Sequence, residues 1–137
     1  MTSLALLDTD TLSEIMKGKN RPIEQHATEY LRTHGRFRFS VITCYEILRG
    51  LKAKQAVRQM AIFRDKCDKS YLYPVTDEII TQASDVYAYL HQKGLLISDA
   101  DIIIASTAMV HNLTLVTGNT DHFTRIPDLH CESWKSP

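Results

Sequence analysis

The sequence contains little cysteine, no long hydrophobic run and no net charge. Its three cysteines, Cys44, Cys67 and Cys131, are widely spaced and form no C-x-x-C pair, so neither a disulfide framework nor a thiolate zinc site is predicted. The chain has no run of about 18 apolar residues, and no basic flank precedes the short apolar run near the N-terminus. We therefore expect a cytoplasmic protein with reduced thiols and no membrane partner.

Length and composition are those of an ordinary globular domain. The chain has 137 residues, of which 44% are hydrophobic and 23% charged. This length is enough to close one hydrophobic core and too short for two, and the composition indicates neither disorder nor a fibrous fold. We expect a single domain over residues 1–137.

The zero net charge conceals two halves of opposite sign. Residues 1–70 carry 13 Lys and Arg against 8 Asp and Glu, whereas residues 71–137 carry 3 against 8. A basic half beside an acidic half suits a protein that holds a polyanion in one region and a cation in the other. Solvated helix faces that differ in charge explain the same counts, so the asymmetry only supports such a function.

The hydrophobic pattern alternates between strands and helices, which predicts an α/β fold with a mainly parallel sheet and helices on both faces. Thr11-x-x-Glu14 and Thr43-x-x-Glu46 resemble capping boxes that open the first and third helices. The predicted strands cover residues 4–8, 36–42, 71–75 and 113–117, and a loop covers 118–123. The predicted helices cover residues 11–17, 22–34, 43–66, 77–93 and 98–112, and the pattern at 43–66 allows a break.

Carboxylates recur where the predicted strands end or the next helices begin. Parallel sheets bind ligands beyond the carboxyl ends of their strands, at the point where the strand order reverses. We therefore expect one crevice to collect the polar side chains at these places, which are Asp8, Glu46, Asp99, Asp101, Asn119 and Asp121.

Each of these acids also has a purely structural explanation. Glu46 completes a capping-box pattern, Asp99 and Asp101 suit the positive end of a helix dipole, and Asp121 is acceptable in a loop. If these acids lie in one cluster, however, their charges repel: two like charges about 4 Å apart repel by about 4 kcal/mol at an effective dielectric near 20. Such a cluster therefore requires a bound cation or protons to neutralise part of its charge. Oxygen ligands without cysteine or clustered histidine favour Mg²⁺ or Mn²⁺, which can activate water for phosphodiester hydrolysis.

Four blocks of the sequence, in this order, resemble the PIN-domain ribonucleases of the VapC toxin type over nearly the whole chain: LLDTDTLSEIMKG, SVITCYEILRG, ISDADIIIASTA and LTLVTGNTDHFTRI. The resemblance implies an α/β/α sandwich and a Mg²⁺- or Mn²⁺-dependent endoribonuclease that cleaves RNA. It also implies the toxin of a type II toxin–antitoxin pair, usually a homodimer that a cognate antitoxin inhibits. The family's acids fall on Asp8, Glu46 and Asp101, with metal contact at Asp8 and Asp101.

The chain departs from the family pattern in two places. Asp10 stands where the family commonly has Asn, so this chain carries an extra carboxylate without an assigned purpose. The family's fourth polar position falls on Asn119, with Asp121 as the nearest carboxylate, and the sequence leaves both open. Thr117 and Asp99 are expected to support the site.

Two other functions fit parts of the sequence. Asp8-x-Asp10-x-Thr also resembles the first motif of haloacid-dehalogenase-type phosphatases, in which the first Asp attacks phosphorus and the second is the general acid. Such enzymes are normally longer, and this alternative leaves Glu46 and residues 118–123 unexplained. A receiver-like switch built on Asp77 lacks the lysine on a later strand that it requires.

Overall fold

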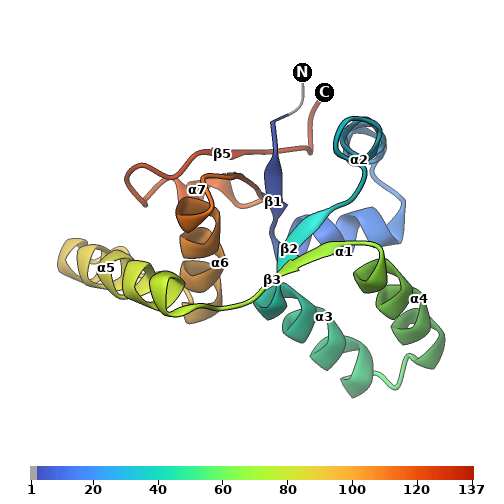
Figure 1. The fold of residues 1–137 in the computed structure, drawn as a ribbon, viewed down its shortest axis with the longest axis horizontal. Helices are drawn as coiled ribbons and strands as arrows, with labels where there is room; N and C mark the ends of the chain where they lie inside the picture. Colours follow the sequence, from blue (N-terminus) through green and yellow to red (C-terminus); the bar gives the residue numbers. More distant parts are fainter. Residues whose placement is uncertain (1–2) are drawn as a thin grey trace.

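The computed structural model describes residues 3–137, and at its centre short parallel strands form a three-stranded sheet and a two-stranded sheet that lie side by side. β4 lies between β1 and β5, and β2 pairs with β3, all in parallel. β2 also lies beside β1, so the spatial order is β3-β2-β1-β4-β5 (Figure 1). The strands are β1 (Ala5–Leu7), β2 (Arg38–Ser40), β3 (Tyr71–Tyr73), β4 (Thr114–Val116) and β5 (Cys131–Glu132).

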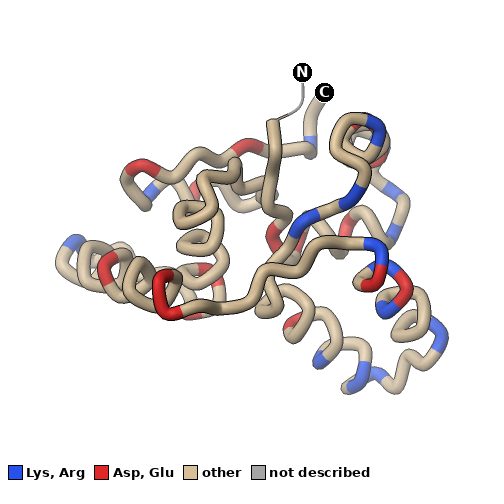
Figure 2. The backbone as a smooth tube through the Cα atoms, viewed as in Figure 1, with Lys and Arg blue, Asp and Glu red and all other residues tan. Residues whose placement is uncertain are grey.

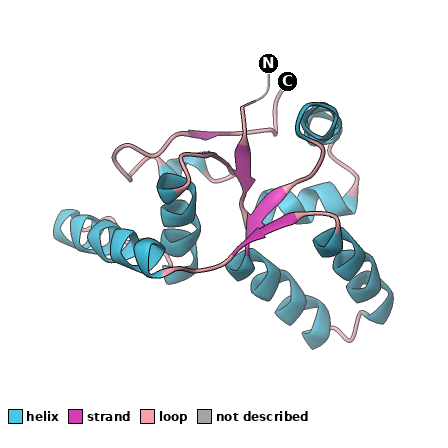
Figure 3. Cartoon of the chain, in the orientation of Figure 1, coloured by secondary structure: helices cyan, strands magenta, loops and turns pink. Residues whose placement is uncertain are grey.

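Helices connect the strands and cover the sheet on both sides (Figure 3). Their bounds are α1 (Thr9–Lys17), α2 (Arg21–His34), α3 (Val41–Ala53), α4 (Val57–Asp68), α5 (Asp77–Lys93), α6 (Asp99–Val110) and α7 (Thr120–Phe123). The α/β fold class with a mainly parallel sheet is therefore confirmed. Within residues 3–137, none of these helices combines the length and apolarity that crossing a bilayer requires.

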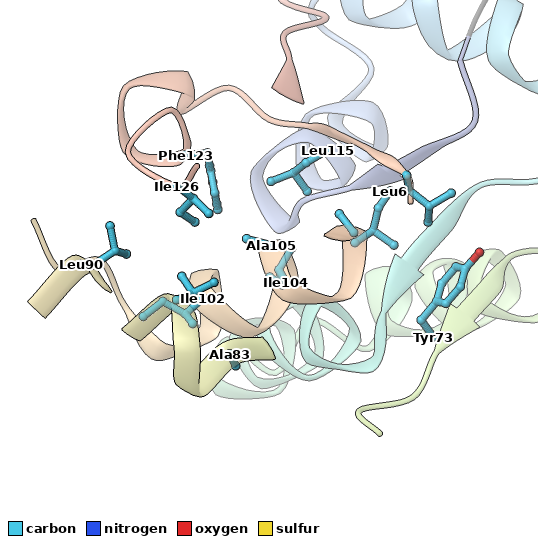
Figure 4. Close-up of a cluster of buried hydrophobic side chains, with 13 residues drawn as sticks. Leu6, Tyr73, Ala83, Leu90, Ile102, Ile104, Ala105, Leu115, Phe123 and Ile126 are labelled. Atoms are coloured by element: carbon cyan, nitrogen blue, oxygen red, sulfur yellow. The ribbon is translucent and has the colours of Figure 1, made fainter. Parts of the chain in front are cut away.

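The alternation of side chains along β1 divides the core into two clusters. Leu6 points into a cluster with α5 and α6, which includes Leu90, Ile104 and Leu115 (Figure 4). Its neighbours on the strand, Ala5 and Leu7, belong to the other cluster, which packs under the helices α1 to α4. Because all three β1 residues are fully buried, the strand is anchored on both faces and holds the residue that follows it in a fixed place.

Two helices begin earlier than their capping-box patterns predict. α1 starts at Thr9 with Asp8 as its N-cap, so Thr11 lies inside the helix. α3 starts at Val41, and its N-cap is Ser40, whose hydroxyl accepts a hydrogen bond from the Ile42 amide at 3.0 Å. The reason is the same at both places: β1 and β2 each have three residues, so the chain turns into the helix as soon as the strand is paired.

The last part of the chain differs from the prediction in two places. The predicted loop at residues 118–123 contains the short helix α7, and the two-residue strand β5 was not predicted. The helical pattern at residues 43–66 is divided into α3 and α4 at Gln55, whose φ is 55°, and this is the break that the pattern allows. These differences leave the arrangement of the sheet as predicted.

Candidate active site

A pocket of about 650 Å³ opens at the carboxyl ends of β1 and β4, where the strand order reverses. We call it the carboxylate pocket, because four acids border it: Asp8 and Asp10 at the start of α1, Asp101 at the start of α6, and Glu46 inside α3. Its lining comes from α1, α3, α6, the β4–α7 turn and the C-terminal segment. The residues that line it are Asp8, Thr9, Asp10, Ser13, Lys17, Glu46, Asp101, Gly118, Asn119, Phe123 and Lys135.

Asp8 joins the end of β1 to the start of α1 and is 5% exposed. Its Oδ1 accepts a hydrogen bond from the Thr11 amide at 2.8 Å, and its own amide donates to the Val116 carbonyl at 3.0 Å. Burial raises the pKa of the Asp8 carboxyl, while hydrogen bonds from Thr117 and Thr11 lower it in part. The carboxylate is thus held rigidly in a place where its charge is poorly solvated.

Glu46 is fixed by a threonine that the sequence analysis did not single out. The Thr9 hydroxyl donates to Glu46 Oε1 at 2.6 Å, and it lies 3.1 Å from the Thr43 hydroxyl. The other oxygen, Oε2, lies 3.7 Å from Arg49, whose side chain is 59% exposed. Because Ser40 caps α3, the capping-box explanation of Glu46 is wrong, and its carboxylate is turned toward the pocket instead.

Asp101 lies in the first turn of α6, and Ser98 caps this helix by accepting from the Asp101 amide at 3.2 Å. Burial raises the pKa of the Asp101 carboxyl, and a hydrogen bond from Ser98 lowers it. The negative charge of Glu46 raises this pKa further, whereas His122 lowers it. Asp101 therefore shares the electrostatic environment of Glu46, as the sequence predicts for members of one site.

The structure distinguishes Asn119 from Asp121. Asn119 lines the pocket, its amide N–H donates to Thr117 Oγ1 at 2.9 Å, and its side chain contacts His122 at 2.8 Å. Asp121 is exposed and is not among the lining residues. Thr117 is fully buried and hydrogen-bonds both Asp8 and the Asn119 backbone, which is the supporting place expected for it.

Asp99 does not join this site, contrary to the expectation from the sequence. It lines a separate groove with Ile80, Tyr87 and Ile103 between α5 and α6. Residues two apart within a helix differ in direction by about 200°, and at this helix start Asp99 is turned toward α5 while Asp101 lines the pocket. The position of Asp99 close to Asp101 at a helix start therefore led to a wrong prediction of where its side chain lies.

The donor atoms around the pocket suit a hard divalent cation. Asp8, Glu46 and Asp101 offer carboxylate oxygens, and Asn119 offers an amide oxygen, without a sulfur ligand among the lining residues. Among residues 3–137, no three His, Cys, Asp or Glu side chains are close enough together to form a metal-binding group by themselves. Mg²⁺ usually keeps several waters and takes only one or two carboxylates from a protein.

Comparisons with known proteins assign the fold to a family. The PIN-domain model matches residues 5–129. Ribonuclease VapC1 of Methanocaldococcus jannaschii is 32% identical over 126 residues, which cover 92% of this chain and 83% of that protein. The DNA-bound VapBC structure from Salmonella typhimurium has a TM-score of 0.86 at 25% identity and covers 97% of this chain and 99% of the matched chain. The DNA-bound VapBC2 structure from Rickettsia felis has a TM-score of 0.80 at 26% identity, with coverage of 95% and 98%.

These matches cover most of this chain and most of each matched protein. The fold is therefore that of a PIN domain, and it is neither a haloacid-dehalogenase-type phosphatase fold nor a receiver fold. The similarity in sequence and the similarity in structure point to the same group. The chain belongs to the PIN-domain family, as a VapC-type member.

Proposed function

We propose that this protein is a Mg²⁺- or Mn²⁺-dependent endoribonuclease that cleaves RNA phosphodiester bonds in the carboxylate pocket. The observation that carries the proposal is the meeting of Asp8, Glu46 and Asp101, which come from separate parts of the chain, around one pocket at the switch point of the sheet. The curated relative from M. jannaschii is named a ribonuclease, which supports RNA as the substrate.

Asp8 and Asp101 are the residues that would hold the metal ion. When bound, a divalent ion at these carboxylates would polarise a phosphoryl oxygen and lower the pKa of a water molecule. Burial raises the pKa of both carboxyls, and a bound cation would favour their ionised forms. A metal ion bound by Asp8 and Asp101 would therefore offset the cost of burying their two negative charges.

The remaining residues have separate tasks. The short hydrogen bond from Thr9 fixes Glu46 Oε1. The other oxygen, Oε2, which lies 3.7 Å from Arg49, would orient the attacking water and accept its proton. Asn119, held by Thr117 and beside His122, presents an amide that can bind a water or a phosphate oxygen. Asp121 is exposed outside the pocket, so we assign the fourth position to Asn119.

The charge distribution suits an RNA that approaches from one side. Lys and Arg gather on the helices α1 to α4, whereas α5 and the C-terminal part carry mostly acids (Figure 2). Basic side chains next to the pocket would neutralise the phosphates that flank the cleaved bond. Most phosphate contacts of this kind do not read sequence, so they hold the RNA without selecting it.

We further infer that the protein is the toxin of a type II toxin–antitoxin pair, acts in the cytoplasm as a homodimer and is inhibited by a cognate antitoxin. The VapBC structures that it resembles support such a partner. The groove that contains Ile80, Tyr87 and Ile103 supports self-association, because it presents apolar side chains on α5 and α6.

The decisive experiment compares cleavage of a mixed RNA pool with hydrolysis of a small phosphomonoester. We expect RNA cleavage with Mg²⁺ or Mn²⁺ and none in excess EDTA, and a rise in melting temperature when either metal is added to the metal-free protein. Glu46→Gln should keep the fold and lower cleavage by orders of magnitude, because the amide retains hydrogen bonding without the charge. Undiminished cleavage in excess chelator, or a preference for the phosphomonoester, would contradict the proposal.

A further inference from the structure

The C-terminal segment beyond β5 passes near α2 (Figure 1), and its Lys135 lines the carboxylate pocket. Trp134 is 2% exposed, stacks on His26 with ring centroids 5.8 Å apart, and donates through Nε1 to Glu132 at 3.4 Å. His26 Nε2 also lies 2.9 Å from the Ser136 carbonyl oxygen. The backbone is therefore held on both sides of Lys135, which fixes the point from which this side chain extends.

Lys135 extends to the mouth of the carboxylate pocket. Its Nζ lies 3.6 Å from Asp10 Oδ2, and the two side chains are 49% and 54% exposed. Both pass closely over Gly118: a Cβ at that position would lie 2.6 Å from Lys135 Nζ and 2.6 Å from Asp10 Oδ2. With a larger residue at position 118 the flexible ends of these two side chains would have to shift, so the pair lies directly against the pocket wall at Gly118.

The ion pair between Asp10 and Lys135 contributes too little to the stability of the fold for that to be its purpose. Half-exposed ion pairs contribute little to the free energy of unfolding, because water and salt screen them and two side chains must be ordered. The Asp10–Lys135 pair also leaves the ammonium with donors that remain free to bind another anion. Among the described residues, the cations that line the pocket are Lys135 and Lys17, and Lys17 lies 3.4 Å from Glu14 on its own helix.

We propose that Lys135 binds a phosphate group of the RNA at the carboxylate pocket, and that Asp10 is a positioning residue that holds the ammonium there before RNA arrives. The inference rests on the proposed ribonuclease function. It gives a purpose to the carboxylate at position 10, where the family commonly has Asn. It concerns a residue beyond the stretch that the PIN-domain model matches, which ends at residue 129.

The salt dependence of RNA binding tests this contact. The probe is a fluorescent single-stranded RNA of random sequence, about 12 nucleotides long, whose Kd is measured by anisotropy in EDTA at several KCl concentrations. Lys135→Met should lose one phosphate contact. We therefore expect its slope of log Kd against log [KCl] to be about 0.7 smaller than that of wild type, and its binding at low salt to be weaker. Lys135→Arg should keep the wild-type slope, because the charge remains.

Lys93→Met is the matched control, because it removes the same charge at the end of α5, outside the residues that line the pocket. Wild-type slopes for both Lys135→Met and Lys135→Gln, or an equal loss in Lys93→Met, would overturn the inference. If wild type cleaves RNA and these slopes are unchanged, only the role of Lys135 fails; if wild type does not cleave RNA, the proposed function fails.

Discussion

Two helix starts supply the proposed metal ligands, and they are built differently. At α1 the ligand is also the cap: Asp8 is buried, accepts a hydrogen bond from the Thr11 amide and faces the pocket. At α6 the two tasks are separate, because Ser98 caps the helix while Asp101, three residues later, faces the pocket half-buried. Helix geometry and site chemistry thus depend on one side chain at α1 and on two side chains at α6.

This difference determines what a substitution can reveal. A substitution of Asp8 can lower both activity and stability, because Asp8 lines the pocket and also caps α1. A loss of cleavage can be attributed to the missing carboxylate only if the new side chain still caps the helix. Asn is a strong N-cap, so Asp8→Asn removes the charge and retains the hydrogen bond to the backbone. At Asp101 no such precaution is needed, since the cap is Ser98.

The largest effect should be the loss of RNA cleavage in Asp8→Asn and in Asp101→Asn. Changing only groups that hydrogen-bond a metal ligand lowers affinity or activity by about 10- to 100-fold, so loss of a ligand itself should lower the cleavage rate by more than about 100-fold. Initial rates on a mixed RNA pool with Mg²⁺, with folding checked by circular dichroism, measure this loss. An Asp8→Asn protein that cleaves as fast as wild type would remove Asp8 from the metal site.

The next effect is in stability and separates the two helix starts directly. Asp8→Ala should be about 1 kcal/mol less stable than Asp8→Asn, because Ala cannot cap the helix. Asp101→Ala and Asp101→Asn should have nearly equal unfolding free energies, since Ser98 still caps α6. Urea unfolding of all four variants in EDTA tests the comparison, and an equal difference at both positions would contradict it.

The general arrangement of this site could be predicted from the sequence because it follows from strand ends. A buried apolar run followed by an acid places that acid at the edge of a parallel sheet, and Asp8, Glu46 and Asp101 all line one pocket as expected. The local capping was predicted wrongly at α1 and α3, because a Thr-x-x-Glu pattern in a helix interior looks the same as one at a helix start.

Contacts between distant parts of the chain could not be predicted in this way. The hydrogen bond between Thr9 and Glu46 joins two helices, and the pair of Asp10 and Lys135 joins the two ends of the chain. Lys135 follows β5, a strand of two residues that leaves no periodic pattern, so its return to the pocket depends on how Trp134 packs. Tertiary packing rather than local propensity determines these positions.

A smaller effect should appear in the pH dependence of stability without metal. Burial raises the pKa of Asp8 above 3.8, so between these two pKa values the folded protein binds more protons than the unfolded chain. The contribution of Asp8 to stability is therefore complete below the unfolded pKa and is lost as pH rises through the folded pKa. Relative to wild type, Asp8→Asn should gain stability over this rise, which urea unfolding in EDTA at successive pH values from about 3.5 to 7 would measure. If the free energies of unfolding of wild type and Asp8→Asn differ by the same amount at every pH, the pKa of Asp8 is not raised in the folded protein.

The smallest effect is expected at Asp10, two residues from Asp8 on the same helix. Asp10 is exposed and is not the cap of α1, which is Asp8. The amide oxygen of Asn can still accept a hydrogen bond from Lys135, so Asp10→Asn should cleave RNA within about two- to threefold of wild type; a loss of that size corresponds to about 0.5 kcal/mol in activation free energy. Initial rates under the conditions used for Asp8→Asn provide the measurement. Loss of all turnover in Asp10→Asn would instead assign the second carboxylate to proton transfer, and the contrast between a buried ligand and an exposed positioning residue would fail.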